Sequence, residues 1–214
     1  RPQADKARHA TRDPTGVVAG GRVPPRENVG ELIPGGGYMT RILSKAVGPT
    51  GKVYVFASQP VAREGQPPPA APVAAITADT ANYGNVQVVI SNFATIANPE
   101  PLDLVWTSQN YHDMHNPGRN LDINAANKAI LNALKPGGLY IVLDHQSAKG
   151  TEFSADLHRI DEAKVKAEVL AAGFEFVGSS SVLRNPADDG AKTIFDPGIR
   201  GKTDQFILKF KKPG

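Results

Sequence analysis

The sequence of 214 residues contains no cysteine, which excludes disulfide bonds and thiolate chemistry. It also has no apolar run long enough to span a membrane. The formal net charge is only +3, and the basic residues form no block except at the tail, around Lys209, Lys211 and Lys212. So small an excess does not favour a nucleic acid as partner.

The composition is that of an ordinary globular protein, with 40% hydrophobic and 21% charged residues. This length suffices for one domain with a full core. Because the chain begins at Arg1 rather than Met, we expect that a segment has been removed. The absence of cysteine suits an exported protein, so we expect a periplasmic location if the missing segment was an export signal, and a cytoplasmic one otherwise. The composition leaves the oligomeric state open.

The most informative segment lies at residues 31–38, which read Glu-Leu-Ile-Pro-Gly-Gly-Gly-Tyr. Apolar residues lead into it from Val29, and a helix-like stretch follows it, so it predicts a turn from a first strand into a first helix. Three glycines let the backbone pass close to a ligand, and the amides that open the helix face that ligand. Folds of the α/β class hold nucleotide-like cofactors in this way.

Further strand and helix patterns alternate along the chain. We expect strands at residues 28–33, 52–57, 86–91, 102–107, 139–144, 174–182 and 204–211, with helices at 38–47, 73–83, 121–134 and 158–172. A proline-rich loop is expected at 64–72, and helices that pack on the domain at 1–27. The alternation predicts an α/β, Rossmann-like domain over 28–214. Its seven-stranded, mostly parallel sheet has helices on both faces and ends in an antiparallel β-hairpin.

This order of parts resembles the class I S-adenosylmethionine-dependent methyltransferases over residues 28–212. The Leu-Lys-Pro-Gly-Gly run at 134–138, before an apolar strand, is frequent in that family. Three further runs are similar to a bacterial group of predicted methyltransferases, whose members often carry an export signal. They are Asn-Tyr-His-Asp at 110–113, His-Arg-Ile-Asp at 158–161 and Arg-Gly-Lys-Thr-Asp-Gln-Phe at 200–206.

The resemblance implies S-adenosylmethionine as cofactor. Glu31 matches the acid of the family's first motif, and Ile33 stands where its first glycine usually lies. The strand 2 acid that holds the ribose is missing, and Ser58 or Gln59 stands in its place. Asn92 replaces the acid expected near adenine. The residues implied to bind the cofactor are Glu31, Gly35, Gly36, Gly37, Tyr38, Ser58, Asn92 and Phe93.

In this family the loop after strand 4 lies beside the transferred methyl group. Here it contains Tyr111, His112 and Asp113. A histidine titrates near neutral pH, so His112 is the favoured general base, oriented by Asp113. Tyr111 and His145, which follows strand 5, complete the expected catalytic set. The loop lacks the prolines of the Asn-Pro-Pro-Tyr motif, so methylation of amide or amino nitrogens is not supported.

Several other polar residues allow more than one interpretation. His112, Asp113, His115, Asp144 and His145 are all placed to converge, but their spacing matches no metal motif, and we expect no metal. His158, Arg159 and Asp161 are expected in the first turn of a helix, with the arginine and the aspartate in a surface salt bridge. The loop with Arg184, Arg200 and Lys202 is equally consistent with a lid over an anionic substrate and with a plain surface loop.

Two other enzyme classes fit less well. A nicotinamide oxidoreductase needs a third glycine where Thr40 stands, and a P-loop needs a hydroxyl residue where Val53 follows Lys52. A non-catalytic ligand-binding protein on a methyltransferase-like scaffold remains the main alternative. The sequence therefore favours methyl transfer from S-adenosylmethionine to a small molecule, with neither nucleic acid nor a membrane span.

Overall fold

The computed structural model describes residues 25, 27–58 and 73–214. The expected N-terminal helices and the expected loop at 64–72 therefore lie outside the described residues. None of the helices in the described part of the chain is long and apolar enough to cross a membrane.

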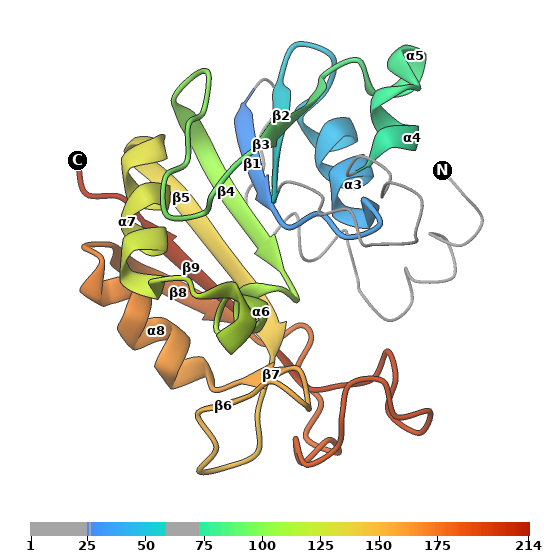
Figure 1. The fold of residues 1–214 in the computed structure, drawn as a ribbon, viewed down its shortest axis with the longest axis vertical. Helices are drawn as coiled ribbons and strands as arrows, with labels where there is room; N and C mark the ends of the chain where they lie inside the picture. Colours follow the sequence, from blue (N-terminus) through green and yellow to red (C-terminus); the bar gives the residue numbers. More distant parts are fainter. Residues whose placement is uncertain (1–24, 26, 59–72) are drawn as a thin grey trace.

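A seven-stranded sheet forms the centre of the molecule, in the order β3-β2-β1-β4-β5-β9-β8 (Figure 1). The first five strands of that order run parallel, and β9 pairs antiparallel with both β5 and β8. The strands are β1 (Asn28–Leu32), β2 (Lys52–Ala57), β3 (Val86–Ile90), β4 (Leu102–Ser108), β5 (Leu134–His145), β8 (Glu175–Ser180) and β9 (Gln205–Lys211). The predicted mostly parallel sheet with a terminal hairpin is confirmed.

Helices pack on both faces of this sheet, as predicted. On one face, α3 (Tyr38–Val47) contacts β1 and β2, and its apolar side is buried with Val29, Val55 and Trp106. On the other face, α7 (Ile123–Ala133) and α8 (Glu162–Ala171) pack together over β5, β8 and β9 (Figure 1). Buried apolar side chains form two clusters, one that includes α3 and one that includes α7 and α8, and these clusters supply the hydrophobic stabilisation of the domain.

The remaining elements are short. They are α4 (Ala74–Thr77), α5 (Thr80–Tyr83), α6 (Tyr111–Met114), η1 (Pro117–Arg119), and a hairpin of β6 (Phe153–Ser154) with β7 (Arg159–Ile160). The single helix predicted over 73–83 is wrong, because α4 ends at Thr77 and Asp79 caps a new helix through the amide of Asn82.

Two predicted boundaries are also wrong. The helix expected from His158 begins only at Glu162, because Arg159 and Ile160 pair with β6 and Asp161 then caps α8 through the amides of Ala163 and Lys164. The strand expected from Leu139 begins at Leu134. The intervening Lys-Pro-Gly-Gly turn stays within the sheet, since Gly137 donates a hydrogen bond to Lys212.

Candidate active site

A cavity of about 310 Å³ opens where β4 and β5 end. The β4 chain continues into α6, and the loop at 181–204 also contributes side chains to the lining. Figure 1 shows this loop beyond the end of β5. The lining residues are Gln109, Asn110, His112, Asp113, His145, His158, Ile194, Phe195, Arg200, Gly201, Thr203 and Gln205. This is the edge at which open parallel sheets bind their ligands.

His112 and Asp144 form a buried pair at the base of the cavity. The Nδ1 atom of His112 lies 2.7 Å from Oδ1 of Asp144, and the backbone amide of His112 donates to Oδ2 at 2.8 Å. Asp144 is fully buried and also accepts from the amide of His145. Because a carboxylate only accepts, Nδ1 of His112 carries the proton, and its Nε2 atom faces the cavity side chains.

The same pair sets the charge of the imidazole. Burial disfavours the charged form of His112, but the carboxylate of Asp144, its hydrogen bond and the nearby Asp113 outweigh burial and raise the pKa above 6.5. Conversely, although burial opposes it, the imidazolium holds the pKa of Asp144 below 3.8. Asp144 rather than Asp113 is therefore the group that orients His112.

His158 meets His112 across the cavity. Its Nδ1 atom lies 3.3 Å from Nε2 of His112 and 3.7 Å from Oδ1 of Asp113. The expectation of a helix-terminal residue is wrong, because His158 immediately precedes β7 and has a left-handed backbone with φ 56°. Its ring packs edge-on against Phe195 of the long loop, at a centroid distance of 5.0 Å.

The glycine turn lies next to this cavity. The side-chain amide of Asn110 donates to the carbonyl of Ile33 at 2.8 Å and to that of Ser108 at 2.7 Å, which ties the turn to the end of β4. Ile33 has φ 52°, so the position where the methyltransferases usually have glycine is left-handed here despite a β-branched side chain. Asn110 thus links the glycine turn to the end of β4. The catalytic set predicted from the sequence does not include this residue.

The three glycines of the turn differ in their surroundings. A Cβ added at Gly35 or Gly36 would have no described atom within 4 Å, so both positions have open space. A Cβ at Gly37 would collide with Ile76 and lie 2.9 Å from Val73, and Gly37 also has φ 73°. The packing of α4 therefore explains the glycine at 37, whereas Gly35 and Gly36 leave room for a ligand.

The acid of the turn, Glu31, is buried and accepts a hydrogen bond from the hydroxyl of Thr40 in α3. Burial raises the pKa of Glu31 to about 8, although the hydrogen bonds with Thr40 act in the opposite direction. The carboxyl group thus holds the start of α3 against β1.

The other residues expected at the cofactor are more dispersed. Tyr38 and Phe93 are buried, whereas Ser58 and Asn92 are exposed at the ends of β2 and β3. The side-chain oxygen of Asn92 accepts from the amide of Ala94.

Tyr111 and His115, at the two ends of α6, belong to a separate hydrogen-bond network with Glu168 of α8. Tyr111 is fully buried, and its hydroxyl contacts Glu168 at 3.0 Å and Asn127 at 2.9 Å. The Nε2 atom of His115 also lies 3.0 Å from the Glu168 carboxylate. Tyr111 thus points into the core and away from the cavity. His145 does line the cavity, where its Nδ1 atom lies 2.8 Å from the hydroxyl of Thr203.

A buried ion pair anchors the long loop that closes the cavity. Arg159 is fully buried and lies 2.9 Å from the carboxylate of Asp188; it also donates to the carbonyls of Gln146 and Lys192. The prediction of a surface salt bridge between Arg159 and Asp161 is therefore wrong. Arg184 is held outside the cavity by Glu162 and Asp204.

Comparisons with known proteins identify the fold. The sequence matches no protein-family model and no curated protein. A methyltransferase from Aquifex aeolicus, described as dependent on S-adenosylmethionine, superposes with a TM-score of 0.67 at 18% identity, over 96% of this chain and 93% of that one.

Two further solved structures are similar. The 1,6-didemethyltoxoflavin-N1-methyltransferase of Burkholderia thailandensis, bound to 1,6-didemethyltoxoflavin and S-adenosylhomocysteine, superposes with a TM-score of 0.66 at 15% identity, over 99% of this chain and 82% of its own. The [4+2]-cyclase SpnF superposes with a TM-score of 0.67 at 18% identity, over 95% of this chain and 81% of its own.

The chain has the class I S-adenosylmethionine-dependent methyltransferase fold. Identities below 20% show the fold alone. Since a cyclase is among the similar structures, this fold does not by itself specify the reaction.

Proposed function

We propose that the protein transfers a methyl group from S-adenosylmethionine to a small molecule held in the cavity. The observation that carries the proposal is the contact of Asn110 with Ile33, which sets the glycine turn beside the cavity in a fold shared with methyltransferases. A cofactor on the turn and an acceptor in the cavity would then be neighbours, as group transfer requires.

The residues of the turn fit such a cofactor. When bound, S-adenosylmethionine supplies an electrophilic methyl group. Gly35 and Gly36 leave open space above the backbone, and Glu31 fixes the start of α3 behind them. We assign the methionine portion to this turn, with Tyr38 beside it, and the adenosine portion to Ser58, Asn92 and Phe93. None of these three carries a charge, so the glycine turn contributes most of the affinity.

His112 is the group that we assign to the acceptor's proton. With Nδ1–H bonded to Asp144, the neutral imidazole has its lone pair on Nε2 and accepts a proton there. Because Asp144 raises the pKa of His112, the fraction of neutral imidazole increases with pH above 6.5. The rate of methyl transfer should therefore rise with pH through this range.

The test is transfer of an isotope-labelled methyl group to a pool of small molecules, read by mass spectrometry. We expect labelled product with the wild type and a loss of about 100-fold or more in His112→Gln, whose cofactor affinity should be unchanged. Full activity in His112→Gln would reject this residue as the base. Absence of both labelled product and cofactor binding would reject the function.

A second candidate function is ligand binding without catalysis on the same scaffold. Two observations favour it. No acid stands at the two positions directly after β2, which are Ser58 and Gln59, and Ile33 places a branched side chain in a left-handed position of the turn. Cofactor binding that is never followed by label transfer to any acceptor would support this alternative.

A further inference from the structure

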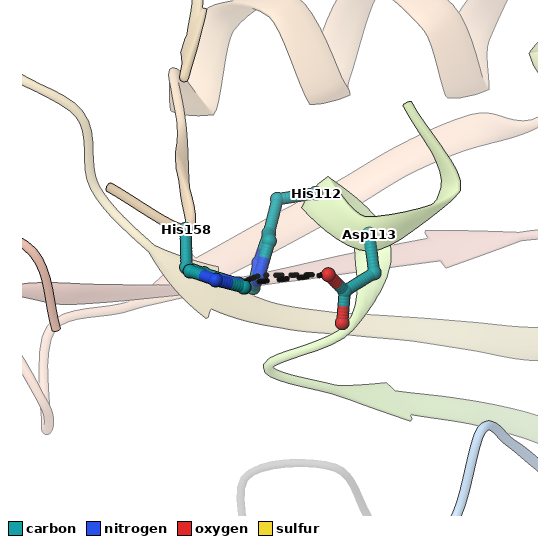
Figure 2. A group of neighbouring side chains, drawn as sticks. All are labelled: His112, Asp113 and His158. Carbon is teal, nitrogen blue, oxygen red and sulfur yellow. Dashed lines mark hydrogen bonds and ion pairs between the residues drawn. The ribbon is translucent and has the colours of Figure 1, made fainter. Parts of the chain in front are cut away.

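Three ligand-type side chains converge at the cavity from two distant segments. His112 and Asp113 come from α6, and His158 comes from the residue before β7. Figure 2 shows the two rings and the carboxylate directed toward one another. We propose that Nε2 of His112, Oδ1 of Asp113 and Nδ1 of His158 bind a divalent transition-metal ion of the zinc type.

The distances between the three atoms fit this ion. They are 3.3 Å between the two histidine nitrogens, 3.5 Å from His112 to Asp113, and 3.7 Å from His158 to Asp113. Zinc bonds of about 2.0–2.2 Å put tetrahedral ligand atoms roughly 3.3–3.6 Å apart, while adjacent octahedral positions would be roughly 3 Å apart. The triangle is therefore close to one face of a tetrahedron.

The donor set also selects the class of metal. Two imidazole nitrogens and one carboxylate oxygen suit zinc and its first-row neighbours, whereas magnesium and calcium take oxygen ligands. Three protein ligands leave the fourth tetrahedral position for water or for a ligand oxygen, the arrangement of catalytic rather than structural zinc sites. Asp113 and His158 are partly exposed, so that position opens to the cavity.

The surroundings fix the ligands in the required form. The bond from Nδ1 of His112 to the buried Asp144 leaves the lone pair on Nε2, which is the carboxylate–histidine support common behind metal ligands. The side-chain amide of Asn116 donates to Oδ1 of Asp113 at 3.0 Å and orients that carboxylate. His158 keeps an unfavourable left-handed backbone, and such strain concentrates at functional sites.

Metal binding at this site does not depend on methyl transfer. With an ion bound, the lone pair of His112 is a ligand, and the ion would instead activate an oxygen held at its fourth position. The metal-bound form therefore cannot use His112 as the general base. Zinc binding and S-adenosylmethionine binding are measured separately, so the absence of one leaves the proposal for the other standing.

The experiment uses the full chain freed of metal by a chelator. Zinc chloride is titrated calorimetrically into the wild type and into His158→Ala and Asp113→Ala, which change partly exposed side chains and spare the buried His112. His115→Gln is the matched control, because His115 contacts Glu168 and does not line the cavity. Circular dichroism verifies that every variant is folded.

We expect one zinc ion per wild-type chain, with affinity reduced about 100-fold or more in both ligand variants and unchanged in His115→Gln. Cobalt in place of zinc should give the intense visible absorption of four-coordinate Co²⁺, and magnesium should not compete. Absence of zinc binding in the wild type would overturn the proposal. Equal zinc affinity in the wild type and both ligand variants would overturn it too, because the ion would then be bound elsewhere.

Discussion

Replacing Arg159 with methionine should destabilise the protein strongly and loosen one wall of the cavity. The guanidinium group contacts both carboxylate oxygens of Asp188 and donates to the carbonyls of Gln146 and Lys192. Both charged side chains are almost fully buried. Methionine fills similar space but leaves the carboxylate of Asp188 buried without its positive partner.

The size of the effect follows from that burial. Removing one partner of a buried ion pair costs about 3–5 kcal/mol, a large share of the roughly 5–15 kcal/mol by which proteins are stable. For a chain of this length, each kcal/mol lowers Tm by about 2–4 °C, so Arg159→Met should melt roughly 6–20 °C below the wild type. Asp188→Asn in that background should cost less than in the wild type, since the two residues are coupled.

The assay is urea denaturation with hydrogen exchange of residues 181–204. The control is Lys211→Met, which breaks the exposed pair with Glu175 and should cost less than about 1 kcal/mol. The anchoring role of Arg159 would be refuted if both variants lost a similar amount of unfolding free energy. It would also be refuted if the hydrogen-exchange rate of the loop did not change in Arg159→Met.

Two further predictions concern the glycine turn. The pKa of Glu31 is about 8 in the folded state and 4.5 in the unfolded chain, so the folded state keeps the carboxyl group protonated to higher pH. The stability of the fold is therefore full below pH 4.5 and declines as the pH rises toward 8. Because Glu31→Gln cannot ionise, its free energy of unfolding should exceed that of the wild type by about 3 kcal/mol at pH 7 but by little at pH 5. Urea denaturation at both pH values measures this difference. An equal difference at both pH values would contradict the raised pKa of Glu31. Asn110→Ala removes the hydrogen bond to Ile33 and should weaken S-adenosylhomocysteine binding about tenfold, which corresponds to one hydrogen bond. Unchanged affinity would mean that the contact does not position the turn.

The parts of the fold that were predictable from sequence are those with local signals. The helix Tyr38–Val47 and the strand Lys52–Ala57 have the predicted bounds, because glycines flank the helix and a run of β-branched and aromatic residues forms the strand. The terminal hairpin was also predictable, since no helix pattern separates its strands. These elements position the glycine turn and the end of β4.

The convergence of His112, Asp144 and His145 was predictable, because they lie at the ends of two neighbouring strands. The pairing of the other side chains was not predictable, because it depends on contacts between distant positions. His158 lies 46 residues from His112, and Arg159 lies 29 residues from Asp188. The stretch from His158 resembles a helix in composition, and only the pairing of β7 with β6 delays the helix to Glu162. The role of Asp144 behind His112 likewise depends on the parallel pairing of β4 with β5.

Calorimetric titration of S-adenosylhomocysteine tests the central claim, that the glycine turn binds the cofactor. The proteins compared are the wild type, Gly36→Leu and Gly118→Leu; both glycines have open space at Cβ, but only Gly36 belongs to the turn. We predict micromolar binding by the wild type and by Gly118→Leu, and none by Gly36→Leu. Absence of binding in the wild type, or wild-type affinity in Gly36→Leu, would contradict the account.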